Sequence, residues 1–415
     1  MNRQLYSVRP PKWHARPSNL WARVLRPLRQ RRARQHYGLG EVDVQGIDQV
    51  KDAVQQGYGV LITPNHPSHA DPFAMLAAAD HLGDPFYFMT AWQVFRDTHF
   101  IGRRVLERHG CFSINREWYD LGAFRRAVDV LQTKSQPLVV FPEGDVYHLN
   151  DRTMPFRHGA AVAALLASRR GKRPVACVPC ALNYRFTSDP SDHLDDLTKQ
   201  LEQRMKSKSD IDMPLAGRIE RINMAMLGQH ERTYLGSLQS GSLADRTEAL
   251  VRVILGRLEY RYQIRRSATS TTDRIMRLRQ HVLTRQQQVR DESRWARQCP
   301  LDLEDLFLAG QLCSYPGDYL ANNPSFERLA ETLDKLEEDV LGVKTASRRG
   351  TRRAVVRFGE PMIVSDYDNL RTAAADLTDA IQSRVQAMLD RFHSRADFRS
   401  LPTPHLLQGN RVCGK

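Results

Sequence analysis

The sequence predicts an α/β fold, with a mostly parallel central sheet flanked by helices and a large, mainly helical insertion. Between residues 46 and 190, short apolar runs alternate with stretches of helical spacing, and this alternation is typical of parallel βαβ units. Residues 191–345 are instead charged and rich in helix formers, with few strand-like runs. One more strand pattern and a closing helix follow within residues 346–395, so the α/β part is expected to resume after the helical block.

Each element of the α/β part has its own signal. Apolar runs at 59–63, 138–141 and 175–179 predict buried strands, and a fourth strand is predicted at 354–358. Helical spacing marks 73–79, 123–132 and 160–167, and the closing helix is predicted at 370–392. Within the insertion, helical periods occur at 194–205, 243–264, 272–297 and 326–341. Residues 396–415 are expected to form a loose tail.

Residues 1–45 are predicted to form a basic N-terminal arm. A helical spacing runs from 19 to 37, where Pro27 is expected to kink the helix because proline cannot donate a backbone hydrogen bond. Such a basic amphipathic helix can lie on an anionic membrane. It can equally pack on its own domain and keep its arginines in solvent, and the pattern leaves both interpretations open. The apolar members are Leu20, Trp21, Val24, Leu25 and Leu28.

The formal net charge of +14 is spread along the whole chain. Such a charge favours anionic partners, which are a phospholipid surface, phosphorylated substrates or nucleic acid. Aromatic and basic residues are not interleaved as in single-strand binders, so no nucleic-acid partner is expected. An anionic membrane surface is the expected macromolecular partner.

The six cysteines have no regular spacing, which fits a reducing compartment better than a disulfide framework. Cys177 and Cys180 form a single C-x-x-C with apolar neighbours, so core packing is a better interpretation than a zinc site. No segment approaches the roughly 20 apolar residues that span a bilayer. The first residues lack the apolar core of a secretory signal. The expected location is cytoplasmic, and peripheral at the inner membrane face.

The loop between the strand at 59–63 and the helix at 73–79 carries the clearest chemical signal. His66 and Asp71 are separated by four residues, and a carboxylate that orients an imidazole suits general-base catalysis. Asp71 followed by Pro72 is also a standard helix start, with Asp as the N-cap and Pro as the first helical residue. Both interpretations of Asp71 can hold together. His69 lies between the pair, but the further ligands of a metallohydrolase are missing from this stretch, so no metal site is predicted.

Four short motifs then occur in order, each at a predicted strand end or loop. Together they resemble the motifs of the glycerolipid acyltransferases, the lysophosphatidate acyltransferase family. The first is Asn65-His66 with Asp71-Pro72, the second is Gly-Cys-Phe-Ser-Ile-Asn-Arg at 110–116, the third is Phe-Pro-Glu-Gly at 141–144, and the fourth is Val-Pro-Cys-Ala at 178–181. Residues 155–160 also fit the basic-Gly-Ala step that follows the third motif.

The resemblance implies a reaction and a role for each matching residue. His66 removes the proton from an acceptor hydroxyl, Asp71 holds His66, and the alkoxide attacks an acyl thioester. The implied donor is acyl-CoA or acyl carrier protein, the implied acceptor is a lysolipid or a glycerol phosphate, and no cofactor is expected. Arg116 would clamp an acceptor phosphate. Glu143 and Gly144 would shape the acceptor pocket, with Arg157 as a second basic residue.

One departure from the family pattern concerns the acceptor. Where many members continue the third motif with Thr and Arg, this chain has Asp145, Val146 and Tyr147. Either Arg157 or Arg152 compensates for the missing arginine, or the acceptor is not a simple phosphomonoester. The substrate is therefore less defined by the sequence than the reaction is.

The resemblance covers about residues 50–190 and 350–395. These two stretches are nearly adjacent in shorter members of the family, which is why 191–345 is interpreted as an insertion. We therefore expect strand 354–358 to join the same sheet as Val139 and Val178. Two rival functions stay open: a metal-dependent hydrolase that uses His66, His69 and Asp71, and a basic membrane- or nucleic-acid-binding protein with degenerate motifs.

Overall fold

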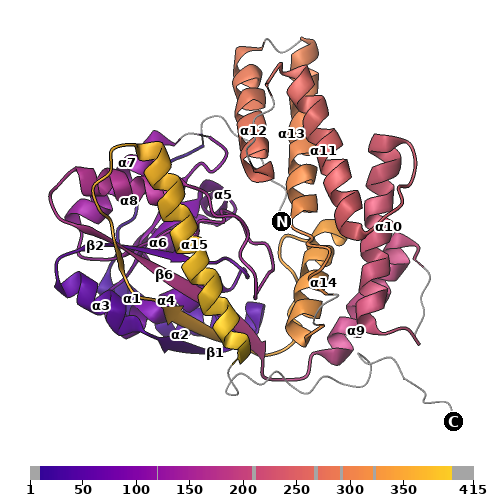
Figure 1. Ribbon diagram of the computed structural model, residues 1–415. Helices are drawn as coiled ribbons and strands as arrows, with labels where there is room; N and C mark the ends of the chain where they lie inside the picture. The colour runs from indigo at the N-terminus through magenta and orange to yellow at the C-terminus, as the bar shows by residue number, and fades with distance from the viewer. Residues whose placement is uncertain are drawn as a thin grey trace. The chain divides into compact units, whose positions relative to one another are not determined.

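The computed structural model describes residues 10–394, apart from residue 119 and the segments 208–211, 266–269, 290–292 and 321–323. These residues form two compact units (Figure 1). Among the described residues, an α/β unit is built from residues 10–189 together with 347–394, and a helical unit comprises Pro190–Ala346. None of the described helices combines the length and the apolar character that crossing a bilayer requires.

The α/β unit is organised around one eight-stranded sheet. Its main path has the order β1-β7-β6-β2-β5-β3-β4, and β8 pairs with β6. The strands from β6 to β4 are parallel, β7 runs antiparallel to β6, and β1 is parallel to β7. The strands are β1 (Leu39–Gln45), β2 (Gly59–Pro64), β3 (Tyr87–Ala91), β4 (Cys111–Ile114), β5 (Leu138–Val139), β6 (Val175–Phe186), β7 (Arg352–Phe358) and β8 (Met362–Ile363).

Helices cover both faces of this sheet. One face packs against α7 (Leu121–Thr133), α8 (Gly159–Arg169) and α15 (Leu370–Ser394), and α15 crosses the sheet in Figure 1. The other packs against α2 (Arg26–Tyr37), α3 (Ile47–Gln55) and α4 (Asp71–Leu82). Strand residues alternate between the two cores, with Leu61 in the first and Val60 and Ile62 in the second. Burial on both faces explains why these strands appear in the sequence as continuous apolar runs.

The predicted return of strand 354–358 to the main sheet is confirmed, because β7 lies directly beside β6.

The alternation of side chains along β6 explains the C-x-x-C pair. Cys177 belongs to one core cluster and Cys180 to the other, so the two thiols lie on opposite faces of β6. Both are buried, and burial raises the pKa of the Cys177 thiol to about 12.

The N-terminal region differs from the predicted arm. Residues 39–45, which the sequence analysis placed in the arm, form β1 at the edge of the sheet. Alternating polar residues hold this strand to β7, where Arg353 donates to Asp43 over 3.0 Å and Arg357 donates to Gln45 over 2.9 Å. The helix predicted at 19–37 breaks at Leu25 into α1 (Asn19–Val24) and α2, because Pro27 in the first turn of α2 lacks an N–H.

The helical unit contains six helices among its described residues. Its mainly helical character was expected, and α14 has the predicted bounds. The single helix predicted at 272–297 is wrong: α12 ends at Gln288, and α13 starts afresh at Arg294 with Ser293 as its N-cap. The helix α10 was not predicted. The six are α9 (Ser191–Met205), α10 (Leu215–Leu235), α11 (Leu243–Arg261), α12 (Thr271–Gln288), α13 (Arg294–Cys313) and α14 (Phe326–Leu341).

Three ion pairs with buried glutamates connect successive helices of this unit. In each, a glutamate near the end of one helix receives two hydrogen bonds from an arginine in the first turns of the next helix. The three arginines stand 28 residues apart along the chain. The helical hairpins α9–α10, α10–α11 and α11–α12 are therefore each closed by the same kind of glutamate–arginine contact. The pairs are Glu202–Arg218, Glu231–Arg246 and Glu259–Arg274.

Candidate active site

His66 and Asp71 meet where β2 ends and α4 begins. His66 Nδ1 lies 2.6 Å from Asp71 Oδ2, which confirms the hydrogen bond expected between them. The Asp71 carboxylate is fully buried, while the His66 ring keeps some exposure. Because an ionised carboxylate can only accept, Nδ1 carries the proton, and Nε2 is the ring nitrogen left to act as a base.

Asp71 is not the N-cap that the helix-start pattern suggested. Helix α4 begins at Asp71 itself, and Ala70 occupies the N-cap position without a side-chain cap. The carboxylate instead turns back toward the loop, where its Oδ2 also accepts from the Ser68 N–H over 3.0 Å. The contacts with His66 and Ser68 therefore tie the carboxylate to the loop that carries the histidine.

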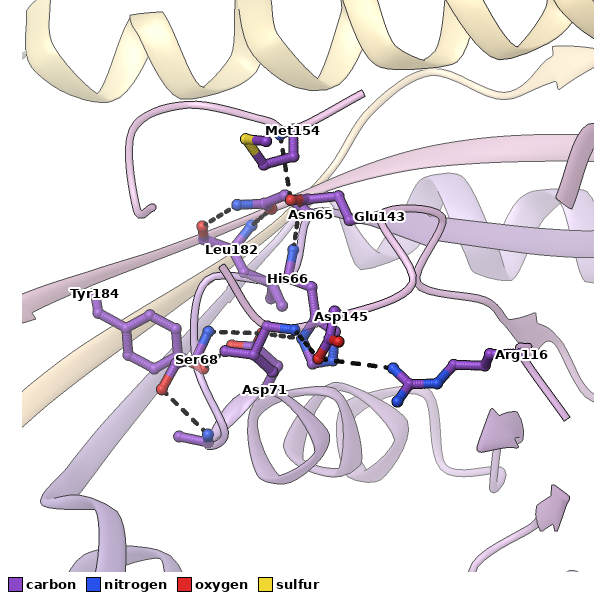
Figure 2. A network of polar contacts seen from close by, with 12 residues as sticks. Asn65, His66, Ser68, Asp71, Arg116, Glu143, Asp145, Met154, Leu182 and Tyr184 are labelled. Carbon is purple, nitrogen blue, oxygen red and sulfur yellow. Dashed lines mark hydrogen bonds and ion pairs between the residues drawn. The ribbon is translucent and has the colours of Figure 1, made fainter. Parts of the chain in front are cut away.

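Tyr184 on β6 provides a contact that the sequence analysis did not identify. Its hydroxyl donates to Asp71 Oδ1 over 2.6 Å, so both carboxylate oxygens are held (Figure 2). Tyr184 is buried in the α4-facing core, and burial raises the pKa of its phenol well above the ordinary value. The hydroxyl therefore stays protonated and can only donate to the carboxylate in this contact.

Two asparagine side chains fix the part of β6 that carries Tyr184. Asn65 donates to Leu182 O over 3.0 Å and accepts from Leu182 N over 2.7 Å. Asn150 makes the same two hydrogen bonds with Tyr184: it donates to Tyr184 O over 2.9 Å and accepts from Tyr184 N over 2.7 Å. Each amide replaces a missing strand partner, so β6 remains paired past the end of β2. The role of Asn65 in the first motif is thus to position backbone.

Glu143 supports the histidine through the main chain. Its Oε1 accepts from the His66 N–H over 2.8 Å, and its Oε2 accepts from the Met154 N–H over 3.2 Å (Figure 2). Burial raises the pKa of Glu143 to about 8, and the nearby Asp71 charge acts in the same direction. Two more contacts fix His66: the Phe141 ring stacks on the imidazole with centroids 4.1 Å apart, and Tyr147 N donates to His66 O over 3.4 Å.

Arg116, Gly144 and Arg157 come together beside this loop. Arg116 donates to Gly144 O through Nη1, and the same nitrogen lies 3.7 Å from Asp145 Oδ1. Gly144 has φ +79°, and a Cβ added there would lie 2.6 Å from the Arg157 guanidinium carbon. Only glycine therefore allows both the left-handed backbone and the close approach of Arg157. Together with Glu143, these residues form one group.

Residues 41–183 match a protein-family model described as Acyltransferase. They form a domain of the glycerolipid acyltransferase family. No curated protein sequence matches the chain. The acyltransferase domain contains all six residues singled out from the sequence, which are His66, Asp71, Arg116, Glu143, Gly144 and Arg157. Acyl transfer is the general activity that this domain indicates.

His69 belongs to a different contact within the acyltransferase domain. Its ring lies edge-on to the His148 ring, with centroids 5.5 Å apart. Across the residues that the structure describes, His66, His69 and Asp71 do not gather their ligand atoms around one point. The geometry therefore gives no support to the rival metallohydrolase interpretation of this cluster.

Proposed function

We propose that this protein transfers a fatty acyl group from a thioester, acyl-CoA or acyl carrier protein, to the hydroxyl of a glycerolipid or lysophospholipid. The family resemblance makes 1-acylglycerol 3-phosphate the reference acceptor, and the reaction needs no cofactor. The single observation that carries the proposal is the hydrogen bond between His66 Nδ1 and the buried Asp71 carboxylate, within an acyltransferase domain.

The proposed reaction is general-base catalysis by His66. Nε2 takes the proton of the acceptor hydroxyl as the oxygen attacks the thioester carbonyl carbon, and an ester C–O bond forms. The C–S bond then breaks, and the leaving thiolate takes the proton from Nε2. Asp71 stabilises the imidazolium between these two transfers, as a buried carboxylate does in other His–Asp pairs. A buried tyrosine donor and a backbone donor keep that carboxylate in place.

The acceptor is proposed to bind beside Gly144. Arg116 and Arg157 both approach this residue, and guanidinium groups bind phosphate oxygens well. Glu143 lies next to Gly144 and is hydrogen-bonded to the His66 backbone. An acceptor phosphate bound here would therefore leave its glycerol hydroxyl within reach of the same loop. Figure 2 shows Arg116 and Asp145 next to the His66 loop.

The site of action is proposed to be the inner face of the cytoplasmic membrane, where the protein binds peripherally. Lipid acceptors reside in bilayers, so the enzyme has to meet them at a surface. The segment α1–α2 supports this proposal, because large apolar side chains and arginines are exposed on it together. Such a segment suits an anionic lipid surface.

The decisive test is acyl transfer from a labelled acyl thioester to a panel of lysolipids and glycerol 3-phosphate. In the variant His66→Ala, transfer should fall by about 10³-fold, because a positioned general base contributes roughly 10²–10⁴-fold. His81→Ala is the matched control, since His81 lies exposed in the last turn of the same helix as Asp71. Full transfer by His66→Ala, or none by the wild type with any hydroxyl acceptor, would refute the proposal.

A further inference from the structure

The group around Gly144 combines two cations with one anion. Asp145 lies in a short loop that is tied to His66 at both ends, through the Glu143 side chain and the Tyr147 N–H. Its carboxylate lies 3.7 Å from Arg116 Nη1, and its Oδ1 accepts from Val146 N over 3.0 Å. The carboxylate is therefore fixed next to the guanidinium proposed to bind the acceptor phosphate.

The ionisation of the neighbouring groups gives the net charge of this cluster. Burial alone would raise the pKa of Asp145, but Arg116 and Arg157 hold it below the ordinary value, so Asp145 is charged at neutral pH. Burial raises the pKa of Tyr147 to about 12 and that of Glu143 to about 8, so neither adds a full negative charge there. Two arginines and one aspartate leave a net charge of about one positive unit.

This balance distinguishes between two kinds of acceptor phosphate. A phosphomonoester has a second pKa near 6 and carries almost two negative charges at pH 7.5. Its second charge would face the Asp145 carboxylate in a partly buried site, where repulsion is weakly screened. A phosphodiester carries one negative charge, which matches the excess of the two arginines over Asp145.

We infer that the acceptor is a lysophospholipid whose phosphate is a diester with one negative charge, and not a phosphomonoester such as 1-acylglycerol 3-phosphate. The inference rests on the proposed function, because it takes the Arg116–Gly144–Arg157 group as the acceptor site. Asp145 is then the residue that sets the headgroup charge the enzyme accepts.

The test compares three acceptors with the purified full-length protein and one labelled acyl-CoA at pH 7.5. They are 1-acylglycerol 3-phosphate, 1-acylglycerophosphoglycerol and monoacylglycerol, each presented in the same uncharged detergent micelles. The wild type should use the diester with a kcat/KM at least tenfold above the other two. In Asp145→Asn, which keeps the shape of the side chain and removes its charge, the monoester-to-diester ratio of kcat/KM should rise about tenfold.

Two controls separate charge at the site from general effects. Asp97→Asn removes a carboxylate that also pairs with an arginine, Arg96, but at the exposed end of α5 (Trp92–Arg96). It should leave the acceptor ratio unchanged. Asp145→Ser serves as a second neutral variant in case Asp145→Asn fails to fold, as judged by thermal unfolding.

Each outcome distinguishes the inference from the proposed function. A wild type that prefers the monoester or the neutral acceptor overturns the inference and leaves acyl transfer intact. So does an unchanged ratio in a folded Asp145 variant. Absence of transfer to all three acceptors, with only hydrolysis of the thioester, overturns both.

Discussion

Among single residues, Tyr184 offers the sharpest test of how the His66–Asp71 pair is held. The phenol donates to the Asp71 oxygen that His66 does not use. In Tyr184→Phe that oxygen loses its donor inside the core, so the carboxylate attracts the imidazolium more strongly. We expect kcat to fall about 10- to 100-fold, because the carboxylate that orients His66 is then held by fewer donors. We also expect the acidic limb of the kcat/KM profile to move to higher pH, because His66 must be neutral to act.

The pH profile distinguishes a role of Tyr184 in positioning the Asp71 carboxylate from a role in packing alone. Tyr260→Phe, at an exposed residue of the helical unit, is the matched control and should change neither kcat nor the profile. If Tyr184→Phe lowers the unfolding temperature but leaves the acidic limb where it is in the wild type, Tyr184 is only a packing residue. A profile displaced toward lower pH would contradict the electrostatic argument directly.

The sequence could identify the His66–Asp71 contact because the two residues are close in sequence, one in a loop and the other at the start of the next helix. The contacts of Tyr184 and Asn150 depend on the register of β6, which extends well beyond the predicted strand at 175–179. A signal was nevertheless present. From Cys180 to Phe186 every second residue continues the apolar face of the strand, and Tyr184 falls on the face that packs against α4.

At the scale of elements, local patterns predicted β2, β5, β6 and β7 of the α/β unit, together with α4, α7, α8 and α15. They did not predict α3 or α6 (Phe100–Arg108). They missed β1, β3, β4 and β8, and the polar residues of β1 are explained only by partners on β7, far away in sequence. The strand predicted at 175–179 is shorter than β6, and the strand predicted at 138–141 is longer than β5, which has only two paired residues, Leu138 and Val139. Pairing between distant segments decides where a strand ends, and a single sequence does not contain that information directly.

The 28-residue spacing in the helical unit is the element-scale feature that the sequence analysis overlooked. Two N-caps share the spacing, since Ser242 and Ser270 each accept from the N–H three residues later. The arginines Arg246 and Arg274 follow four residues after these caps and bind glutamates of the preceding helices. Apolar periodicity alone does not reveal such a repeat, because its members are polar residues that meet across hairpins.

The pair Glu231–Arg246 tests how much these hairpin contacts stabilise the helical unit. Both side chains are buried, so Glu231→Ala leaves a charged guanidinium without its partner. Removing one member of a buried pair costs about 3–5 kcal/mol, and urea unfolding should show a loss of that size. Replacing both residues by Met should recover much of the loss, since no unpaired charge remains.

The surface pair Glu248–Arg252 is the control for that measurement. These residues lie on the same helix, α11, with exposed side chains 2.7 Å apart. Glu248→Ala should cost less than about 1 kcal/mol because solvent screens exposed pairs. Equal losses for Glu231→Ala and Glu248→Ala would show that burial of the first pair contributes nothing to stability.

At the scale of the whole molecule, the helical unit is inserted between two neighbouring strands of one sheet. β6 leads into it and β7 leads out, and β7 pairs along its whole length with the second half of β6, from Cys180 to Phe186. Just beyond the strand ends, Thr187 N donates to Thr351 O over 2.8 Å, and Thr351 N donates to Ser188 Oγ over 2.8 Å. The chain therefore leaves the sheet and returns to it at one point. This arrangement explains how an insertion of this length leaves the sheet of the α/β unit unbroken.

Attachment to membranes is the prediction that concerns the whole chain, and α1–α2 is the segment we expect to provide it. Leu20, Trp21, Val24 and Leu28 are all exposed there. Exposed arginines surround them, so anionic lipid should both attract the segment and allow shallow burial of its apolar side chains. The exposed arginines are Arg23, Arg26, Arg31, Arg32 and Arg34. We predict binding to vesicles that contain anionic lipid, and weaker binding as salt rises, because screening acts over roughly 8 Å at physiological ionic strength.

The double variant Trp21→Ala/Leu28→Ala should reduce vesicle binding about tenfold without changing acyl transfer to acceptors in detergent micelles. The reason is that full burial of a large apolar side chain contributes roughly 1.5–3 kcal/mol and shallow insertion recovers only part of it. Leu238→Ala, at an exposed leucine of the helical unit, is the matched control and should bind as the wild type does. Equal binding to neutral vesicles at high salt would refute the charge-based attachment. The proposed reaction would survive that result, because it depends on His66 and Asp71 and not on how the protein reaches its lipid.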